Sequence, residues 1–321
     1  MSKIVITGRI PEVAVEMLRA EHEVDAWSAD ESISRDELLS RVVGADALVT
    51  LLTERVDAEL LDAAGPQLQV VANVAVGYDN IDVPACVERG VTATNTPGVL
   101  TEATADTAFA LILMATRRTG EGERVIRSGQ PWKWGMFYLL GRGLQGKTLG
   151  IVGMGAIGVA VARRSRAFGM NVIYQSLFEL SPDVAAELGA RRVLELDELL
   201  ATADVVSLHC WYSPETHHLI GAAQFAAMRE TAYLVNTARG PIVDEAALVD
   251  ALRDGQIAGA GLDVYEREPL VEPGLLELDN VALLPHLGSA TIETRTAMAT
   301  LAAGNALAVL RGEHPPTPIQ S

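Results

Sequence analysis

Cysteine is scarce in this sequence, because Cys86 and Cys210 are the only two among 321 residues. Neither belongs to a CxxC pair or to a Cys/His set with metal-ligand spacing, so no metal site is expected. Both cysteines lie in apolar surroundings. We therefore expect two buried, reduced thiols.

Long apolar runs are also missing. Charged residues or glycine interrupt every hydrophobic stretch well before it reaches the length of a membrane span. The N-terminal segment MSKIVITGRIPEVAVEML lacks the basic start and the apolar core of a signal peptide. We therefore expect a cytoplasmic protein with no membrane partner.

Basic residues are in short supply. Lysine and arginine total 25 against 42 aspartate and glutamate residues, which gives a formal net charge of −17. Such an acidic surface repels the phosphates of nucleic acids, so nucleic acid is not an expected partner.

Hydrolase signatures are absent as well, because the sequence contains neither a GxSxG motif nor an ordered Ser-His-Asp set.

The sequence does contain two series of short β-branched segments that alternate with helical periods. The first fills about one hundred residues, and the second runs from TLGIVG to VALLPH. This order predicts two parallel sheets, each covered by helices on both faces, and therefore an α/β fold with two doubly wound domains. A last helix from about Thr291 to Arg311 has no strand after it, which predicts a return to the first domain. We expect residues 1–99 and 288–321 to form one domain, with 100–287 inserted as the second.

A helix is predicted between the two series, starting at Thr101 and ending near Arg118, because acidic residues lie in its first turns and arginines at its end. The following stretch, 119–147, is expected to be irregular and is rich in glycine, tryptophan and tyrosine. Exposed aromatic side chains leave apolar surface in water, so this stretch is expected to bind a second subunit. A homodimer is the predicted assembly.

A glycine-rich turn ends the strand predicted at TLGIVG. Gly153, Gly155 and Gly158 form a GxGxxG pattern immediately before a predicted helix, which is the context of a dinucleotide-binding turn. The glycines permit a tight turn, close approach of a pyrophosphate and close packing of helix on strand, while the helix N-terminus attracts phosphate. The pattern predicts dinucleotide binding, and a merely structural turn is the alternative.

Three further residues stand near the ends of predicted strands, where open α/β sheets bind ligands. Arg239 can grip a carboxylate with its guanidinium fork, although an ordinary surface salt bridge is the alternative. Glu268 and His286 follow two other strands, and a carboxylate bonded to an imidazole makes an acid/base pair usable near neutral pH. With the dinucleotide turn, this set predicts hydride transfer at a carbon that bears a hydroxyl group next to a carboxylate. His217 and His218 have no matching partner in the sequence pattern.

The motifs GMGAIG, SPETHHLI, VNTARGPIVDE, AGAGLDVYEREP and LLPHLGSAT resemble those of the D-isomer-specific 2-hydroxyacid dehydrogenases, and the likeness covers nearly the whole chain. NVAVGYDNIDV, TNTPGVLTEATAD and the WKWG segment are most similar to glyoxylate and hydroxypyruvate reductases. The resemblance implies a Rossmann dinucleotide-binding domain inserted in a flavodoxin-like substrate domain. It also implies NAD or NADP as cofactor, a small 2-keto or 2-hydroxy acid as substrate, and a dimer built through the inserted domain.

The resemblance further implies roles for individual residues. Arg239 orients the substrate, His286 exchanges the hydroxyl proton, and Glu268 supports His286. The residues implied on the substrate side are Leu52, Val76, Gly77, Trp134 and Arg239, with the N–H groups of Val76 and Gly77 holding the carboxylate. The residues implied to contact the dinucleotide are Thr104, Gly153, Gly155, Ala156, Ile157, Gly158, Gln175, Ser176, Leu177, His209, Trp211, Thr216, Thr237, Ala238, Arg239, Asp263, His286 and Gly288.

Three positions depart from the family pattern at the adenosine end. Gln175 and Leu177 stand where an aspartate for NAD or an arginine for NADP is usual, and Trp211 replaces a proline. They offer neither a carboxylate for the ribose hydroxyl nor a cation for a 2′-phosphate. They predict a remodelled adenosine pocket, natural or engineered, with weak discrimination between NAD and NADP and accommodation of a smaller base. A substitute such as Glu179 or a neighbouring loop is the alternative.

Two other functions stay open on the sequence. The same scaffold serves oxidation of phosphite or formate, and a non-enzymatic corepressor-like protein that senses NAD(H) keeps the same arginine, glutamate and histidine. Corepressors of that type carry long extra termini, whereas this sequence ends ten residues beyond Arg311. We therefore expect an enzyme.

Overall fold

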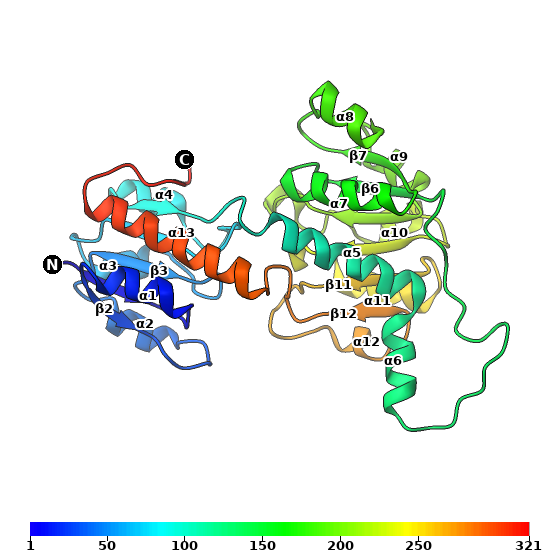
Figure 1. Ribbon diagram of the computed structural model, residues 1–321, viewed down its shortest axis with the longest axis horizontal. Coiled ribbons are helices and arrows are strands. Elements are labelled where there is room, and N and C mark those ends of the chain that lie inside the picture. The colour runs from blue at the N-terminus through cyan, green and yellow to red at the C-terminus, as the bar shows by residue number, and fades with distance from the viewer. Residues whose placement is uncertain (321) are drawn as a thin grey trace. The chain divides into compact units, whose positions relative to one another are not determined.

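The computed structural model describes residues 1–320 and divides into two compact units, each built on one parallel sheet (Figure 1). The first unit contains Met1–Leu100 together with the segment from Ala290 onward, and the second contains Thr101–Ser289. All strand pairs in both sheets are parallel. The predicted α/β class with two doubly wound sheets is confirmed.

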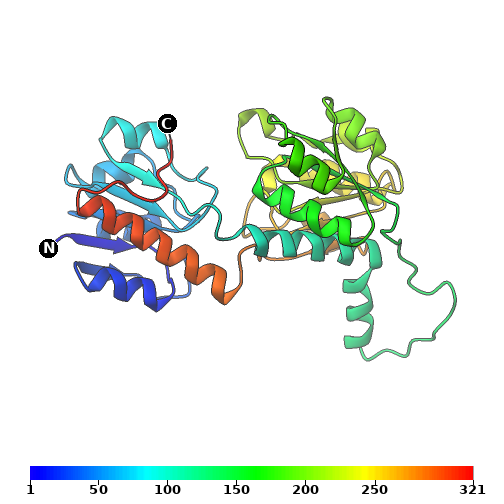
Figure 2. The same ribbon diagram turned by 45° about the horizontal axis from the view of Figure 1, so that its top comes forward.

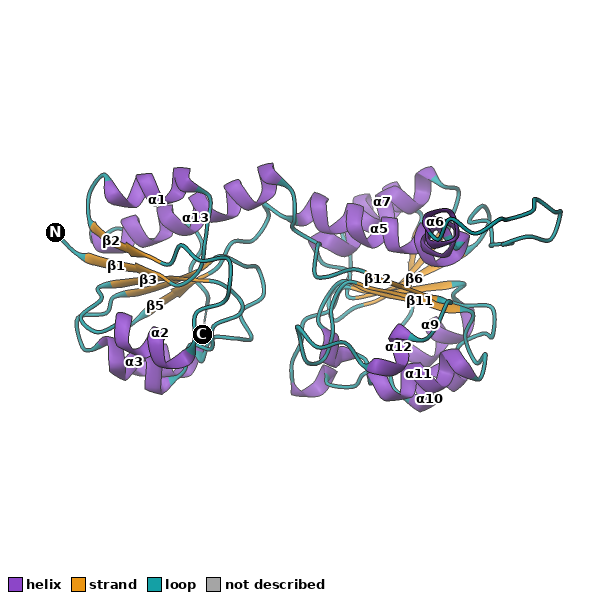
Figure 3. Ribbon diagram, turned by 90° about the horizontal axis from the view of Figure 1, so that it is seen from below, coloured by secondary structure: helices purple, strands orange, loops and turns teal. Residues whose placement is uncertain are grey.

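The first unit has a five-stranded sheet of order β2-β1-β3-β4-β5. Its strands are β1 (Lys3–Ile6), β2 (Glu23–Ala26), β3 (Ala47–Thr50), β4 (Val70–Asn73) and β5 (Thr92–Thr94). Its helices are α1 (Glu12–Arg19), α2 (Arg35–Arg41), α3 (Ala58–Ala64), α4 (Val83–Glu88) and α13 (Ile292–Leu310). Helices α1 and α13 cover one face of the sheet, while α2 and α3 cover the other (Figure 3).

Helix α13 packs closely on this sheet because its buried stripe is made of alanine. Ala299, Ala302, Ala303 and Ala306 are fully buried against residues of β1, β3 and β4. The helix begins at a cap in which the Thr291 hydroxyl accepts a hydrogen bond from the Thr294 N–H at 3.0 Å. The segment after the second unit therefore completes the core of the first.

The second unit has a seven-stranded sheet of order β12-β11-β10-β9-β6-β7-β8. Its strands are β6 (Thr148–Val152), β7 (Asn171–Gln175), β8 (Ala190–Arg192), β9 (Val205–Leu208), β10 (Tyr233–Asn236), β11 (Gly259–Leu262) and β12 (Val281–Leu283). Its helices are α5 (Thr101–Arg117), α6 (Thr119–Arg127), α7 (Ala156–Ala167), α8 (Pro182–Leu188), α9 (Leu196–Thr202), α10 (Ala222–Ala227), α11 (Glu245–Arg253) and α12 (Pro273–Leu276).

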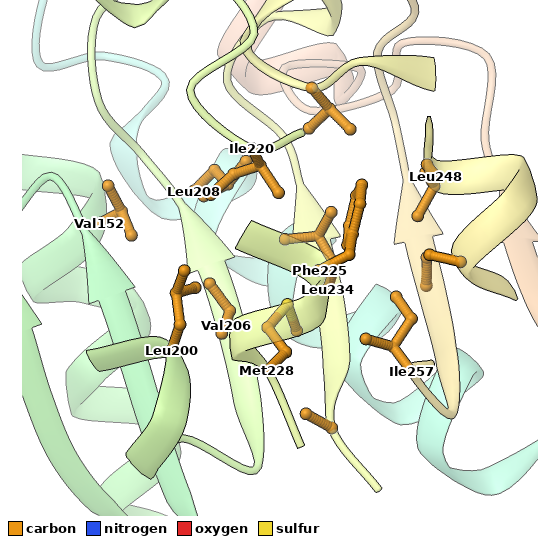
Figure 4. Packing of buried hydrophobic residues seen from close by; sticks show 14 of the residues in the cluster. Val152, Leu200, Val206, Leu208, Ile220, Phe225, Met228, Leu234, Leu248 and Ile257 are labelled. Atoms are coloured by element: carbon orange, nitrogen blue, oxygen red, sulfur yellow. The ribbon is translucent and has the colours of Figure 1, made fainter. Parts of the chain in front are cut away.

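Both faces of the second sheet are covered. Helices α5 and α7 lie on one face, and α9 to α12 lie on the other (Figure 3). Figure 4 shows part of the core on the second of these faces, where Phe225 of α10 packs among Leu208, Leu234 and Leu248. Because the central strands are buried on both sides, their short segments are almost entirely apolar.

The segment after α5 differs in part from the expectation. Residues 119–147 were expected to be irregular, but the first nine form helix α6. Ion pairs along the helix support it despite its two glycines, because Glu121 pairs with Arg118 and Glu123 pairs with Arg127. The sequence does not indicate strands β2 and β8 or helix α2, since short strands and helices carry little periodicity.

The rest of this segment is a long loop beyond α6 that stands away from the sheet in each view (Figure 2). Its apolar side chains are largely in solvent, with Trp134 76%, Met136 72% and Phe137 88% exposed. We call residues 128–143 the arm. Monomeric proteins rarely expose so many large apolar side chains together.

Both cysteines are free, with Cys86 buried and Cys210 half-buried. Burial raises the pKa of each thiol to about 11, so both are protonated at neutral pH. Within residues 1–320, no helix has the length and apolar character needed to cross a membrane. In the same residues no group of three or more His, Cys, Asp or Glu side chains is arranged to hold a metal ion.

Candidate active site

The turn between β6 and α7 requires its glycines for steric reasons. Gly153 has a φ of +92°, and a Cβ there would lie 2.4 Å from the backbone nitrogen of Cys210. A Cβ at Gly158 would lie 2.5 Å from the Gly153 carbonyl oxygen. By contrast, a Cβ at Gly155 would meet nothing within 4 Å. The turn is thus tightly packed at Gly153 and Gly158, and it leaves open space at Gly155, beside the N-terminus of α7.

This open space fits the pyrophosphate of a dinucleotide. Gly155 caps α7 without a side chain, and Ala156 and Ile157 form the first turn, whose N–H groups have no acceptor within the helix. Further along the same sheet edge, the Thr237 hydroxyl is buried and lacks a hydrogen-bond partner within residues 1–320. An orphaned hydroxyl at the carboxyl end of β10 is the kind of group that a bound ligand satisfies.

The adenosine end of the edge is formed by the residues after β7. Gln175 is half-buried and its carbonyl accepts a hydrogen bond from the Gly153 N–H at 2.9 Å. Ser176 is half-buried, whereas the Leu177 side chain is 87% exposed. Arg192 of β8 adds a cation to this loop, because its Nη2 donates a hydrogen bond to the Ser176 carbonyl at 2.9 Å. The sequence pattern did not indicate this residue. Only the pairing of β7 with β8 brings Arg192 to this place.

The loop after β9 borders the same edge. His209 is half-buried, and removal of its ring from water lowers the pKa to about 4, while its Nε2 lies 2.8 Å from the Ser207 hydroxyl. It is therefore a neutral imidazole at physiological pH. Trp211 is 56% exposed, and its carbonyl accepts a hydrogen bond from the Thr216 hydroxyl at 2.8 Å.

Asp263 holds the segment that carries His286. Its buried carboxylate accepts hydrogen bonds from the N–H groups of Leu287 at 2.6 Å and Gly288 at 2.7 Å, and its carbonyl accepts one from the His286 N–H at 2.8 Å. Burial raises the pKa of this carboxyl, although the two N–H donors oppose the effect. A Cβ at Gly288 would lie 3.5 Å from the Thr104 methyl, so Thr104 of α5 adjoins this segment.

His286 and Glu268 form a hydrogen-bonded pair. His286 Nδ1 lies 2.8 Å from Glu268 Oε2, and Glu268 Oε1 accepts a hydrogen bond from the Tyr265 N–H at 3.0 Å. Burial alone raises the pKa of Glu268, but the bond and charge of His286, the Tyr265 N–H and the charge of Arg239 outweigh burial and leave the pKa lowered. Glu268 is therefore ionised at neutral pH. The backbone at His286 is left-handed, with φ +56°, which is unusual for a residue other than glycine.

Arg239 follows β10 in a hydrogen-bonded turn. The Asn236 side chain spans the turn, because its Nδ2 donates to the Arg239 carbonyl at 2.9 Å and its Oδ1 accepts from the Ala238 N–H at 3.0 Å. Gly240 lies against the backbone of Tyr265, where a Cβ would be 1.8 Å from the carbonyl carbon. The turn bearing Arg239 is thus packed directly on the loop bearing Glu268, and within this unit the structure brings together all three residues of the expected catalytic set.

The expectation that His218 lacks a partner is wrong. Its Nε2 hydrogen-bonds the Glu266 carboxylate, and the Glu266 N–H donates to Glu245 Oε1 at 2.9 Å. His217 stacks on His218 with ring centroids 4.1 Å apart. The His218–Glu266 pair joins segments 48 residues apart, so no local pattern could indicate it. It supports the loop that also carries Glu268.

Three of the other expected substrate residues lie in the first unit, whereas Trp134 lies in the arm of the second. The Gly77 carbonyl accepts a hydrogen bond from Asn73 Nδ2 at 3.0 Å, and the Val76 carbonyl accepts one from Asn95 Nδ2 at 2.8 Å. Among residues 1–320, the N–H groups of Val76 and Gly77 donate to no acceptor. Leu52, after β3, is 37% exposed. Two adjacent donors on a fixed loop form a place where an anion can bind.

Proton exchange by a histidine–glutamate pair beside a dinucleotide-binding sheet edge is the chemistry of a nicotinamide-dependent dehydrogenase, and this is the class that the fold and the second unit define. Residues 109–288 match the family model described as "D-isomer specific 2-hydroxyacid dehydrogenase, NAD binding domain". The chain belongs to the D-isomer specific 2-hydroxyacid dehydrogenases. The predicted family, enzyme class and NAD(P) cofactor are confirmed.

Several known proteins resemble the whole chain. The glyoxylate reductase of Thermococcus onnurineus is 50% identical over 320 residues, covering 98% of this chain and 95% of the relative. A crystal structure of a Thermus thermophilus protein has a TM-score of 0.92 at 46% identity, covering 99% of this chain and 100% of that one. The NADPH-dependent glyoxylate/hydroxypyruvate reductase of Sinorhizobium meliloti, solved with NADP and malonate, has a TM-score of 0.87 at 35% identity, covering 99% and 96%.

Proposed function

We propose that this protein reduces glyoxylate and hydroxypyruvate to the corresponding 2-hydroxy acids, with His286, Glu268 and Arg239 as its catalytic residues. The observation that carries the proposal is the hydrogen bond between His286 Nδ1 and Glu268 Oε2 at 2.8 Å. It leaves Nε2 of the same ring for a substrate oxygen. The choice of substrate is supported by the name of the Thermococcus onnurineus relative, a glyoxylate reductase that is 50% identical to this chain.

Each residue has a defined task in this proposal. The bound nicotinamide supplies or accepts the hydride. Arg239 binds the substrate carboxylate with its guanidinium fork, because a planar fork matches two carboxylate oxygens. His286 gives a proton from Nε2 to the carbonyl oxygen as the alcohol forms and takes it back in oxidation. Glu268 fixes the ring and, because it is ionised, stabilises the imidazolium.

The remaining expected residues complete the proposal. Val76 and Gly77 in the first unit are assigned to the substrate carboxylate, because their N–H groups are two adjacent donors without acceptors in residues 1–320. Gly153, Gly155 and Gly158 are assigned to the pyrophosphate, and Thr104, Thr237 and Asp263 to the nicotinamide half. Leu52 and Trp134 are assigned to the substrate side.

A substrate panel tests the proposal. Glyoxylate, hydroxypyruvate and pyruvate are reduced with NADH and with NADPH, while phosphite and formate are oxidised with NAD and with NADP, and kcat/KM is measured for each pair. The highest values are expected for glyoxylate and hydroxypyruvate. Faster oxidation of phosphite or formate contradicts the proposal. Dinucleotide binding without turnover of any substrate favours a sensing protein instead.

Glu268→Gln tests the acid/base pair through the pH profile. The change removes the negative charge 2.8 Å from the imidazole, so the protonated ring becomes less favourable. In reduction, which needs the protonated ring, the loss of rate at high pH is expected to begin at a lower pH. In oxidation, which needs the neutral ring, the loss at low pH is expected to move down as well. Profiles of log kcat against pH in both directions measure this, and unchanged limbs in both mean that Glu268 is only structural.

We also propose that the arm binds a second copy of the chain, since water otherwise covers Trp134, Met136 and Phe137. Phe137→Asp is expected to shift the protein from dimer toward monomer in sedimentation velocity. Leu276→Asp is the matched control, because Leu276 is 66% exposed in the same unit but outside the arm. A dimer that withstands the Phe137 change, or a parent protein that sediments as a monomer, contradicts this assignment.

A further inference from the structure

We propose that Arg192 binds the 2′-phosphate of NADP(H) and makes this enzyme prefer NADP(H) over NAD(H), an inference that rests on the proposed function. The weak discrimination between NAD and NADP that the sequence predicts is based on Gln175, Leu177 and Trp211, with a neighbouring loop as the alternative source of contacts. Arg192 belongs to the neighbouring strand β8, and its partner in the strand register is Tyr174, just before that loop.

The contacts of the Arg192 guanidinium place it at the loop after β7. Nη2 donates to the Ser176 carbonyl at 2.9 Å and lies 3.4 Å from the Leu177 carbonyl. This loop borders the adenosine ribose in open dinucleotide-binding sheets. Within residues 1–320, no other lysine or arginine side chain forms a hydrogen bond or ion pair with residues 175–179. Arg192 is therefore the one cation bonded to this loop in the described chain.

The two carbonyl bonds do not use the whole guanidinium. An arginine carries five N–H donors, and both bonds come from Nη2. Nε is buried without a hydrogen-bond partner in residues 1–320. Nη1 faces Glu179, but the two lie 3.7 Å apart and the Glu179 side chain is 72% exposed. If Arg192 only stabilised the loop, the donors at Nε and Nη1 would have no hydrogen-bond acceptor. The three oxygens of a 2′-phosphate can accept hydrogen bonds from them.

The rest of the loop is compatible with a 2′-phosphate. Position 175 holds a neutral glutamine, so the carboxylate that accepts the ribose hydroxyl of NAD and repels a phosphate is missing. Ser176 is half-buried beside the Arg192 contact and carries a hydroxyl donor. The protein carries a net charge of −17, so binding of a dianion requires a local cation that overcomes the general repulsion of phosphates.

Arg192→Gln is the principal test, with Arg191→Gln as the matched control. Arg191 is the adjacent residue of β8, is exposed, and pairs with Glu198 at 2.8 Å. We measure kcat/KM for NADPH and NADH with glyoxylate, and the affinity of the enzyme for adenosine 2′,5′-bisphosphate and for 5′-AMP by calorimetry. Arg192→Gln is expected to lower the NADPH/NADH ratio and the bisphosphate affinity by about 10- to 100-fold, the size expected for hydrogen bonds to a charged group. Arg191→Gln is expected to change neither.

Glu179→Gln provides a second, independent variant. It removes the competing carboxylate 3.7 Å from Nη1, so it is expected to raise bisphosphate affinity a few-fold while 5′-AMP affinity stays the same. The parent affinity for the bisphosphate is also expected to fall with added salt more steeply than that for 5′-AMP.

The outcomes separate this inference from the proposed function. A parent enzyme that prefers NADH, an unchanged NADPH/NADH ratio in folded Arg192→Gln, or no response to Glu179→Gln overturns the role of Arg192. Loss of glyoxylate reduction with both cofactors in the parent, together with bisphosphate binding that still depends on Arg192, overturns the proposed substrate and leaves the cofactor assignment standing.

Discussion

Replacing His286 by alanine is expected to lower kcat for glyoxylate reduction by roughly 10²- to 10⁴-fold, the usual contribution of a positioned general acid. The imidazole is the group assigned to the substrate oxygen, and its Nδ1 is occupied by Glu268 at 2.8 Å. Dinucleotide affinity is expected to stay close to that of the parent, because the pyrophosphate site at α7 and the Asp263 carboxylate are untouched. Single-turnover kinetics and a fluorescence titration with NADPH measure the two quantities separately.

The control for this prediction is His314→Ala. His314 is exposed in the first unit, where its Nδ1 lies 2.9 Å from the Pro315 carbonyl. Its replacement is expected to leave both quantities at parent values. If His286→Ala turns over at nearly the parent rate, the proton comes from another group and the acid/base assignment fails.

The parts of the fold and site that could be predicted from the sequence have local causes. Gly153 and Gly158 occupy positions where a Cβ would collide with the backbone within 2.5 Å, and that constraint acts within one βα unit. The parallel character of both sheets could be predicted for the same reason, because parallel strands need helical crossovers that leave a periodic pattern. His286, Glu268 and Arg239 each follow such a strand, which makes their gathering at one edge a consequence of topology.

The parts that could not be predicted depend on neighbours distant in sequence. Arg192 contacts Ser176 because β7 and β8 are adjacent strands, yet β8 is only three residues long and has no detectable period. His218 meets Glu266 across 48 residues. Helix α6 buries none of its own residues, and its Arg124 pairs with Asp279, 155 residues away, at 3.1 Å. In each case tertiary contacts outweigh weak local preferences.

Arg239→Lys is expected to lower kcat/KM for 2-keto acids by about 10²-fold or more, the scale of losing one positioned donor to the reacting group. Lysine keeps the charge but presents a single ammonium in place of a planar fork, so it cannot bind two carboxylate oxygens in fixed geometry. The bound 2-keto acid then loses its orientation toward the hydride and toward His286. We expect kcat to fall and KM to rise, since a misplaced substrate reacts slowly and also binds weakly.

The prediction is sharpened by comparing Arg239→Lys with Arg253→Lys. Arg253 ends α11 on the surface, where it pairs with Asp250 at 3.1 Å, so its replacement is expected to leave steady-state kinetics unchanged. Thermal unfolding of both variants checks that the loss of activity at Arg239 is not a loss of fold.

Because the charge of Arg239 also helps to lower the pKa of Glu268, lysine at 239 is expected to preserve most of the pH profile while the rate falls. A variant within a few-fold of the parent in kcat and KM removes Arg239 from the substrate site, whereas a low rate with a shifted profile means that Arg239 acts mainly through Glu268.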